Sequence, residues 1–149
     1  MVQVIGEPEV QVSLMPEEAY VQFWPQIEAE LDKVPHVWED CFTKEFLREV
    51  PWHRELTVWC TVEKGAVMMV IYAQFIYTPR GKGLFFRLAL GNGLDKAMPS
   101  LEATFERLAQ ETGCDFAQIG GRRGWLRKLR DFKEDYVVMT RQLQNFKVQ

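Results

Sequence analysis

A glycine-rich turn is the part of this sequence whose residue types and spacing could do chemistry. It follows an apolar run, precedes a helical pattern, and comprises Gly91, Asn92, Gly93 and Leu94. Glycines let backbone N–H groups approach a phosphate closely, and the start of a helix adds positive potential there. Arg87 could add a positive charge, whereas Asp95 adds a negative one. Two interpretations are open: a turn that joins a strand to a helix, or an anion-binding loop.

Other residues that could take part in catalysis are scattered. Glu63, His53 and Asp115 are candidate general bases, and no surrounding motif selects one of them. The three cysteines are far apart and include no Cys-x-x-Cys pair, which favours buried thiols over a disulfide framework or a zinc site. With only two histidines, the sequence predicts no metal site and no catalytic triad.

Charge is unevenly distributed along the chain, whose net charge is −3. Residues 1–55 hold twelve acidic and four basic residues, and residues 56–149 hold nine acidic and fourteen basic ones. The densest basic patch comprises Arg122, Arg123, Arg127, Lys128, Arg130 and Lys133. We interpret it either as a solvated helix face that pairs with the acidic half or as a docking surface for a protein partner. Nucleic acid is not expected, because the whole chain is acidic and shows no interleaving of aromatic and basic residues suited to base stacking.

The elements that would position the glycine turn are three apolar runs at residues 56–62, 66–77 and 84–90. The first alternates apolar and polar residues, which predicts one exposed face, whereas the second is almost continuously apolar, which predicts burial on both faces. The links between the runs are short and contain glycine. Because a parallel return needs a crossover of about a dozen residues, these links predict an antiparallel meander with a buried central strand.

Before the meander, the sequence predicts an edge strand at 10–14 and two helical stretches. The stretch 16–33 contains Pro25, which predicts a kink or two shorter helices. The stretch 37–50 is typical of a less regular helix. This region is rich in aromatic residues, which would either cover the sheet or line a cleft; they are Trp38, Phe42, Phe46 and Trp52.

After the meander, a helical pattern places Pro99 in a first turn and Gly113 at the end. A strand at 115–119 follows, parallel to the third meander strand, and then a short helix at 122–130 and a strand at 136–143. The predicted fold class is α+β: a mixed, mostly antiparallel central sheet with helices on both faces, in a single domain, 1–149. No apolar run reaches the length of a membrane span and no secretory leader is evident, so we expect a cytoplasmic protein.

This order of elements resembles the GNAT family of N-acetyltransferases, and more narrowly the small acetyltransferase-like proteins of tailed bacteriophages. The closing segments 122–129, 131–132 and 136–143 are similar to the short helix, the turn and the strand of that group. The resemblance spans nearly the whole chain. It implies an acyl-CoA N-acyltransferase-like fold, in which an active member uses acetyl-CoA.

The same resemblance implies that Gly91, Asn92, Gly93 and Leu94, with Arg87, form the acetyl-CoA loop. In the family an arginine or glutamine stands one residue closer to the first glycine than Arg87 stands here. The tyrosine that often serves as general acid has no counterpart in 126–130, and Asp131 replaces the glycine of the following turn.

The resemblance allows two functions. The first is a non-catalytic bacteriophage protein, structural or assembly-associated, with a degenerate acetyl-CoA site and no cofactor. Its partners would be other protein subunits, including virion or assembly proteins, in the host cytoplasm or the virion. The second is an active acetyl-CoA-dependent N-acetyltransferase, with an amine over the sheet near Trp38, Trp52 and Trp59. The displaced arginine and the missing tyrosine favour the first, and no catalytic residue is assigned.

Overall fold

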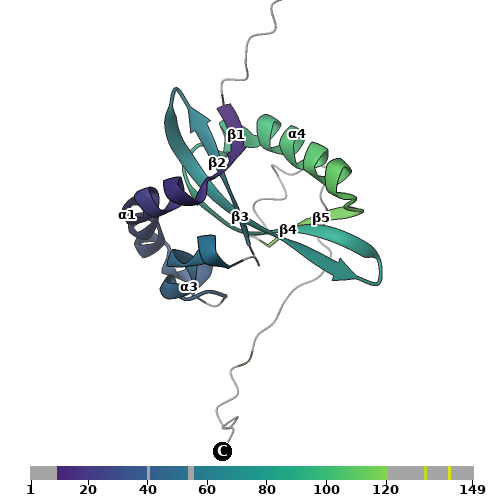
Figure 1. Ribbon diagram of the computed structural model, residues 1–149, viewed down its shortest axis with the longest axis horizontal. Coiled ribbons are helices and arrows are strands. Elements are labelled where there is room, and N and C mark those ends of the chain that lie inside the picture. The colour runs from purple at the N-terminus through teal and green to yellow at the C-terminus, as the bar shows by residue number, and fades with distance from the viewer. Residues whose placement is uncertain (1–9, 40, 54–55, 121–132, 134–140, 142–149) are drawn as a thin grey trace, which may run out of the picture.

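A five-stranded sheet forms the centre of the protein in the computed structural model, which describes residues 10–39, 41–53, 56–120, 133 and 141. The strands are β1 (Val10–Leu14), β2 (Thr57–Glu63), β3 (Ala66–Thr78), β4 (Gly81–Gly91) and β5 (Phe116–Ile119). The helices are α1 (Glu17–Lys33), α2 (Pro35–Trp38), α3 (Lys44–Arg48), the 3-10 turn η1 (Val50–Trp52) and α4 (Leu94–Thr112). Their order along the chain is shown in Figure 1.

The sheet follows the chain order, β1-β2-β3-β4-β5. Neighbouring strands from β1 to β4 are antiparallel, and β5 lies parallel to β4 after the crossover through α4. The predicted edge strand, the antiparallel meander and the parallel fifth strand are therefore confirmed. The short links force β2, β3 and β4 to run antiparallel, whereas a return in the same direction needs a long crossover such as the one through α4.

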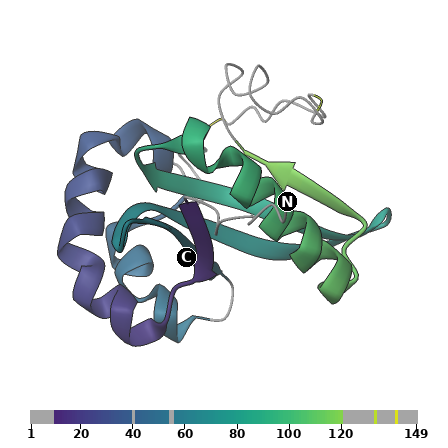
Figure 2. The ribbon, with the colours of Figure 1, turned by 90° about the horizontal axis from the view of Figure 1, so that it is seen from above.

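Helices cover both faces of this sheet, as the fold class predicted (Figure 2). On one face α1, α2 and α3 pack over β2, β3 and β4, and the core there includes Ile27, Leu31, Leu47 and Tyr72. On the other face α4 packs over β1, β3 and β4 through Ala97 and Leu101. The middle of the central strand β3, from Met69 to Ala73, is buried on both faces and contributes to both cores, whereas the ends of the strand are more exposed.

The first helix is a single helix, so of the two outcomes predicted at Pro25, a kink or two shorter helices, the second is wrong. Pro25 lies inside α1 and cannot donate a hydrogen bond to the carbonyl four residues earlier. That carbonyl belongs to Val21, which is 48% exposed and can be hydrated. Burial of Tyr20, Trp24, Ile27 and Leu31 on one face then holds the helix together across the proline.

The predicted second helix at 37–50 is wrong as one element, because the region forms α2, α3 and η1. Helix α1 ends at Lys33, and Pro35 begins α2, where its missing N–H costs nothing. Thr43 is the N-cap of α3, and its Oγ1 accepts a hydrogen bond from the Phe46 N–H at 3.0 Å. Short capped pieces replace a long helix here.

Two further expectations are corrected on the α4 side of the sheet. The polar face of β2 is covered rather than exposed, and Thr61 on this face is fully buried. Helix α4 begins at Leu94, so Pro99 lies in its interior and not in its first turn. Gly113 ends α4 in the left-handed conformation, as predicted.

Two tyrosines join the sheet to the helices beneath it. The Tyr20 hydroxyl donates to the Leu47 carbonyl at 2.5 Å, and the two hydroxyls of Tyr20 and Tyr72 are 2.8 Å apart. Since Tyr20 has one proton and gives it to Leu47, Tyr72 must donate to Tyr20. This chain of bonds connects α1, β3 and α3 inside the core.

The predicted helix 122–130, the strand 136–143 and most of the basic patch lie outside the described residues. Within the described ranges, no helix has both the length and the apolar character needed to cross a membrane. The same part of the chain holds no group of three or more histidine, cysteine or acidic side chains arranged for a metal ion.

Candidate functional site

The glycine turn lies at the end of β4, beyond the point where β4 and β5 stop pairing. The two strands are paired over four residues only, from Gly83 opposite Phe116 to Phe86 opposite Ile119. The last bond between these chain segments runs from the Gly120 N–H to the Phe86 carbonyl, at 3.1 Å. Strand β4 continues to Gly91, and none of the described strands pairs with this second half on the β5 side.

Backbone groups of the second half of β4 face this open side. The Asn92 N–H donates to the Met68 carbonyl of β3 at 3.1 Å. Residues of an antiparallel ladder alternate in the direction of their backbone groups, so those of Gly91 and Ala89 point away from β3. This edge of β4, which is open with respect to the described strands, therefore presents donors and acceptors at the spacing of an extended strand.

Both glycines of the turn adopt backbone conformations that other residues avoid. Gly91 has a φ of +112°, and a Cβ at this position would collide with the Met68 carbonyl oxygen. Gly93 has a φ of +87° and is the N-cap of α4, with its carbonyl accepting from the Ala97 N–H at 3.0 Å. The turn thus delivers the chain from the end of β4 directly into the first turn of a long helix.

The charges around the start of α4 are mostly negative. Asp95 lies in the first helical turn, where it suits the helix dipole. Lys96 follows it, but its ammonium group forms an ion pair with Glu63 at the end of β2. Hence the positive potential of the helix start is partly neutralised by Asp95 before any anion arrives.

Arg87 lies in β4 and is directed to the opposite face of the sheet from α4. Its guanidinium carbon is 5.5 Å from the centre of the Phe42 ring and 5.0 Å from that of Phe85. Phe42 packs against the core under α1. Four residues along a strand span about 13 Å, so the structure does not bring this charge to the glycine turn.

The three candidate bases are not brought together either. Glu63 is paired with Lys96, and a carboxylate oxygen of Asp115 accepts from the Lys82 N–H at 3.0 Å. The imidazole of His53 stacks on Phe46 with ring centres 5.0 Å apart. None of the three lies in the second half of β4 or in the glycine turn.

The expected amine surface of three tryptophans is wrong. Trp38 is buried under α1 and donates its indole N–H to the Leu31 carbonyl at 2.8 Å. Trp59 packs on the other face, edge-on to Phe105 of α4. Only Trp52 is widely exposed, at 62%. Burial in two different cores separates these rings, which spacing along the sequence could not reveal.

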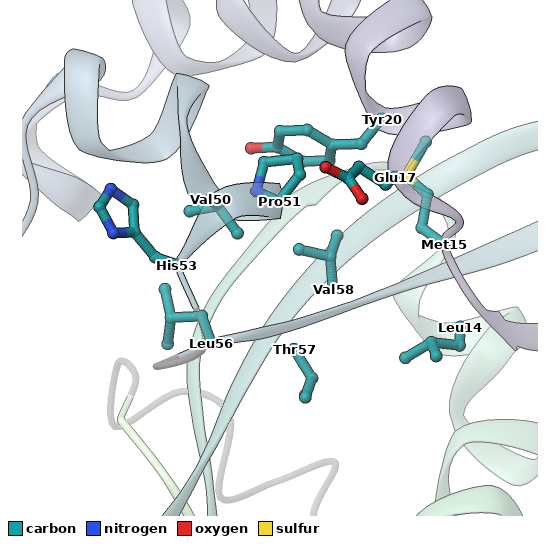
Figure 3. Close-up of a pocket in the computed structure, with 10 residues that line it drawn as sticks. All are labelled: Leu14, Met15, Glu17, Tyr20, Val50, Pro51, His53, Leu56, Thr57 and Val58. Carbon is teal, nitrogen blue, oxygen red and sulfur yellow. The ribbon is translucent and has the colours of Figure 1, made fainter.

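A second site, which sequence reasoning missed, is a pocket of about 190 Å³ at the other edge of the sheet (Figure 3). It lies between the end of β1, the start of α1, η1 and the start of β2. Its lining comprises Leu14, Met15, Glu17, Tyr20, Val50, Pro51, His53, Leu56, Thr57 and Val58. No motif marks it, because its walls come from three separate stretches of the chain.

Comparison with known proteins shows similarity in structure but not in sequence. No protein-family model and no curated protein sequence matches this chain. A ribosomal-protein-alanine N-acetyltransferase from Brucella melitensis matches with a TM-score of 0.64 at 11% identity, over 90% of this chain and 99% of that one. An aminoglycoside acetyltransferase from a soil metagenomic sample matches with a TM-score of 0.66 at 11% identity, over 91% and 97%.

A GNAT family acetyltransferase from Staphylococcus aureus matches with a TM-score of 0.59 at 9% identity, over 91% of this chain and 99% of that one. Together these neighbours show that the chain has a GNAT-like acetyltransferase fold. They give no support to the resemblance to bacteriophage proteins, which stays a prediction.

Proposed function

We propose that this protein binds an acyl-CoA thioester along the open edge of β4 and transfers its acyl group, an acetyl group, to an amine. The observation that carries the proposal is the second half of β4, which pairs with no described strand on its β5 side and ends in a glycine turn at the start of α4. The acetyltransferase fold supports it.

The residues present fit the two ends of such a cofactor. The pantetheine arm is extended and contains amide groups, so it can bond to the backbone of Ala89 and Gly91 as an added strand would. The pyrophosphate would lie at Gly93 and Leu94, where backbone N–H groups at a helix start favour an anion. The Asn92 N–H does not contribute, because Met68 already accepts it. When bound, the thioester supplies the activated acyl group.

A second function is favoured by the charges at the turn. Asp95 stands in the first turn of α4, and Arg87 is held on the other face of the sheet. Both features weaken pyrophosphate binding. They favour a protein that keeps the fold as a non-catalytic scaffold and binds other protein subunits.

Calorimetric titration with acetyl-CoA separates the two functions. Gly93→Asn and Gly93→Asp are matched variants, since both side chains tolerate positive φ and differ only in charge. We expect micromolar binding to the wild type, retained in Gly93→Asn and weakened about tenfold or more in Gly93→Asp by repulsion of the pyrophosphate. Asp95→Asn should bind more tightly than the wild type.

Absence of heat at millimolar acetyl-CoA would overturn the acyl-CoA proposal and favour the scaffold. Equal binding by Gly93→Asn and Gly93→Asp would place the cofactor elsewhere. If acetyl-CoA binds at the turn, release of free CoA thiol in the presence of a panel of amines tests acetyl transfer itself.

A further inference from the structure

The pocket beside β1 forms where this strand leaves the sheet. The last bond between β1 and β2 in this corner runs from the Met15 N–H to the Val58 carbonyl, at 2.9 Å. The chain then turns at Pro16 into α1. Leu56 and Thr57 therefore extend beyond the end of β1, and the pocket occupies the space that a longer β1 would fill.

Leu56 presents backbone groups to this space. Because the Val58 carbonyl faces β1, alternation along the strand directs the N–H and carbonyl of Leu56 to the same side. Leu56 is 7% exposed as a whole residue, and no described residue forms a hydrogen bond with its backbone. Within the described part of the chain, its carbonyl is therefore an acceptor at the pocket that no protein donor uses.

Glu17 supplies a carboxylate at the same place. Figure 3 shows its side chain among the residues that line the pocket. No ion pair or hydrogen bond joins this carboxylate to any described residue. With Glu18, it places two negative charges in the first turn of α1, which outweigh the half positive charge of a helix start.

The remaining walls are apolar or already bonded. Met15, Val50, Leu56 and Val58 belong to the core under α1. The Tyr20 hydroxyl is used by Leu47 and Tyr72, and the Thr57 hydroxyl donates to the Ala73 carbonyl at 3.0 Å. His53 stacks on Phe46, with its Nε2 3.8 Å from a carboxylate oxygen of Glu49. The pocket therefore combines an apolar wall with two acceptors that no described residue uses, the Glu17 carboxylate and the Leu56 carbonyl.

We propose that this pocket binds a primary ammonium group carried on a short aliphatic stem. The ammonium has three N–H donors, of which one meets the Glu17 carboxylate and one meets the Leu56 carbonyl. The stem packs against the apolar wall, which has room for a group about the size of one side chain. The site is separate from the glycine turn, since β3 lies between β2 and β4 in the sheet. The proposal of an ammonium site therefore does not depend on whether acyl-CoA binds.

The test uses n-butylammonium chloride as the probe and 1-butanol as its uncharged counterpart. Titration is followed by the backbone amide signals of the ¹⁵N-labelled protein. We expect butylammonium to shift the amides of Leu56, Thr57 and their pocket neighbours with a saturable curve, whereas butanol shifts them at least about tenfold more weakly.

Glu17→Gln and Glu18→Gln are the matched variants, because both residues are in the first turn of α1 and only Glu17 lines the pocket. Glu17→Gln should weaken butylammonium binding at least about tenfold, and Glu18→Gln by less than about twofold. Equal weakening by the two variants, or equal binding of butylammonium and butanol, would overturn the proposal. No saturable shift of pocket amides in the wild type would also overturn it, and that result does not depend on whether a variant folds.

Discussion

Thr61 is a buried polar residue whose hydroxyl has no described partner. It lies in β2 under α4, fully buried, and its Oγ1 bonds to none of the described residues. Burying a hydroxyl without a hydrogen bond costs about 1–3 kcal/mol relative to water. A methyl group of the same size would fill the space without that cost.

Replacing Thr61 with valine should therefore stabilise the protein by about 1 kcal/mol. The measurement is the free energy of unfolding from urea denaturation. Thr57→Val is the control, since the Thr57 hydroxyl does have a partner in the Ala73 carbonyl and its loss should destabilise. A lower stability of Thr61→Val than of the wild type would mean that this hydroxyl is bonded in solution.

The pair Tyr20 and Tyr72 titrates far from the usual range. Burial, partly offset by the hydrogen bond with Tyr72, raises the pKa of Tyr20 to about 12, from an ordinary value of 10.0. Burial and the neighbouring Tyr20 raise the pKa of Tyr72 well above the ordinary value. The folded state therefore keeps both protons at a pH where the unfolded chain loses them.

This difference predicts that alkali destabilises the fold. Because the pKa of Tyr20 is higher in the folded protein than in the unfolded chain, Tyr20 contributes stability to the folded state. This contribution is complete below pH 10 and is lost as the pH rises towards about 12. The free energy of unfolding should fall across this interval in the wild type and fall less in Tyr20→Phe. Absorbance titration of the tyrosinate band should show a component near pH 12 that Tyr20→Phe lacks. Identical curves for the two proteins would contradict the assignment.

At the scale of elements, the junction of β4 and α4 depends on two glycines for different reasons. Gly91 has positive φ and no room for a Cβ against Met68, whereas Gly93 has positive φ with open space around it. Gly91→Ala should cost about 3 kcal/mol, from strain plus collision. Gly93→Ala should cost only about 1 kcal/mol, from strain alone. Thermal unfolding of the two variants side by side checks this order, and equal losses would show that the collision at Gly91 is relieved by small shifts.

Most elements could be predicted from the sequence because their signals are local. The short links at 63–65 and 78–83 forced the meander, and Gly113 marked the end of α4. The failures have tertiary causes. Pro25 stays within α1 because one face of the helix is buried, and Thr61 is covered by a helix that follows it by more than thirty residues.

The candidate site was less predictable than the fold. The glycine turn was found because Gly91 and Gly93 are unusual together, and the structure places it at the end of β4. Strand register and a bulge in β4 decide two features of the site. One is the hydrogen bond from Asn92 to Met68, and the other is the direction of Arg87 towards the rings of Phe42 and Phe85. Neither can be deduced from spacing, since a one-residue bulge reverses which face a side chain takes.

At the scale of the whole molecule, the two cores share one sheet. Leu31 belongs to the core under α1, and Leu101 to the core under α4. Since β3 and β4 contribute to both, loss of either core exposes the strands that support the other. The described part of the chain should therefore unfold as one unit.

Leu31→Ala and Leu101→Ala should each lower the free energy of unfolding by about 2–5 kcal/mol. Each variant should still unfold in a single transition, with a lower midpoint than the wild type. Far-UV circular dichroism and tryptophan fluorescence should give the same midpoint, because Trp38 reports on one core and Trp59 on the other. Two separated transitions in Leu101→Ala would show that α4 can leave the sheet on its own.

The pairing of β1 with β2 has a consequence for synthesis on the ribosome. Leu14 pairs with Trp59, so the first strand and the buried face of α1 emerge well before the sheet that covers them. The β2–β3 and β3–β4 hairpins make the most local pairings, since each is closed by two residues, between Glu63 and Ala66 and between Thr78 and Gly81. Folding should therefore wait for these hairpins, and until then we expect the excess of acidic residues in the first 55 positions to keep the nascent chain from associating with its neighbours.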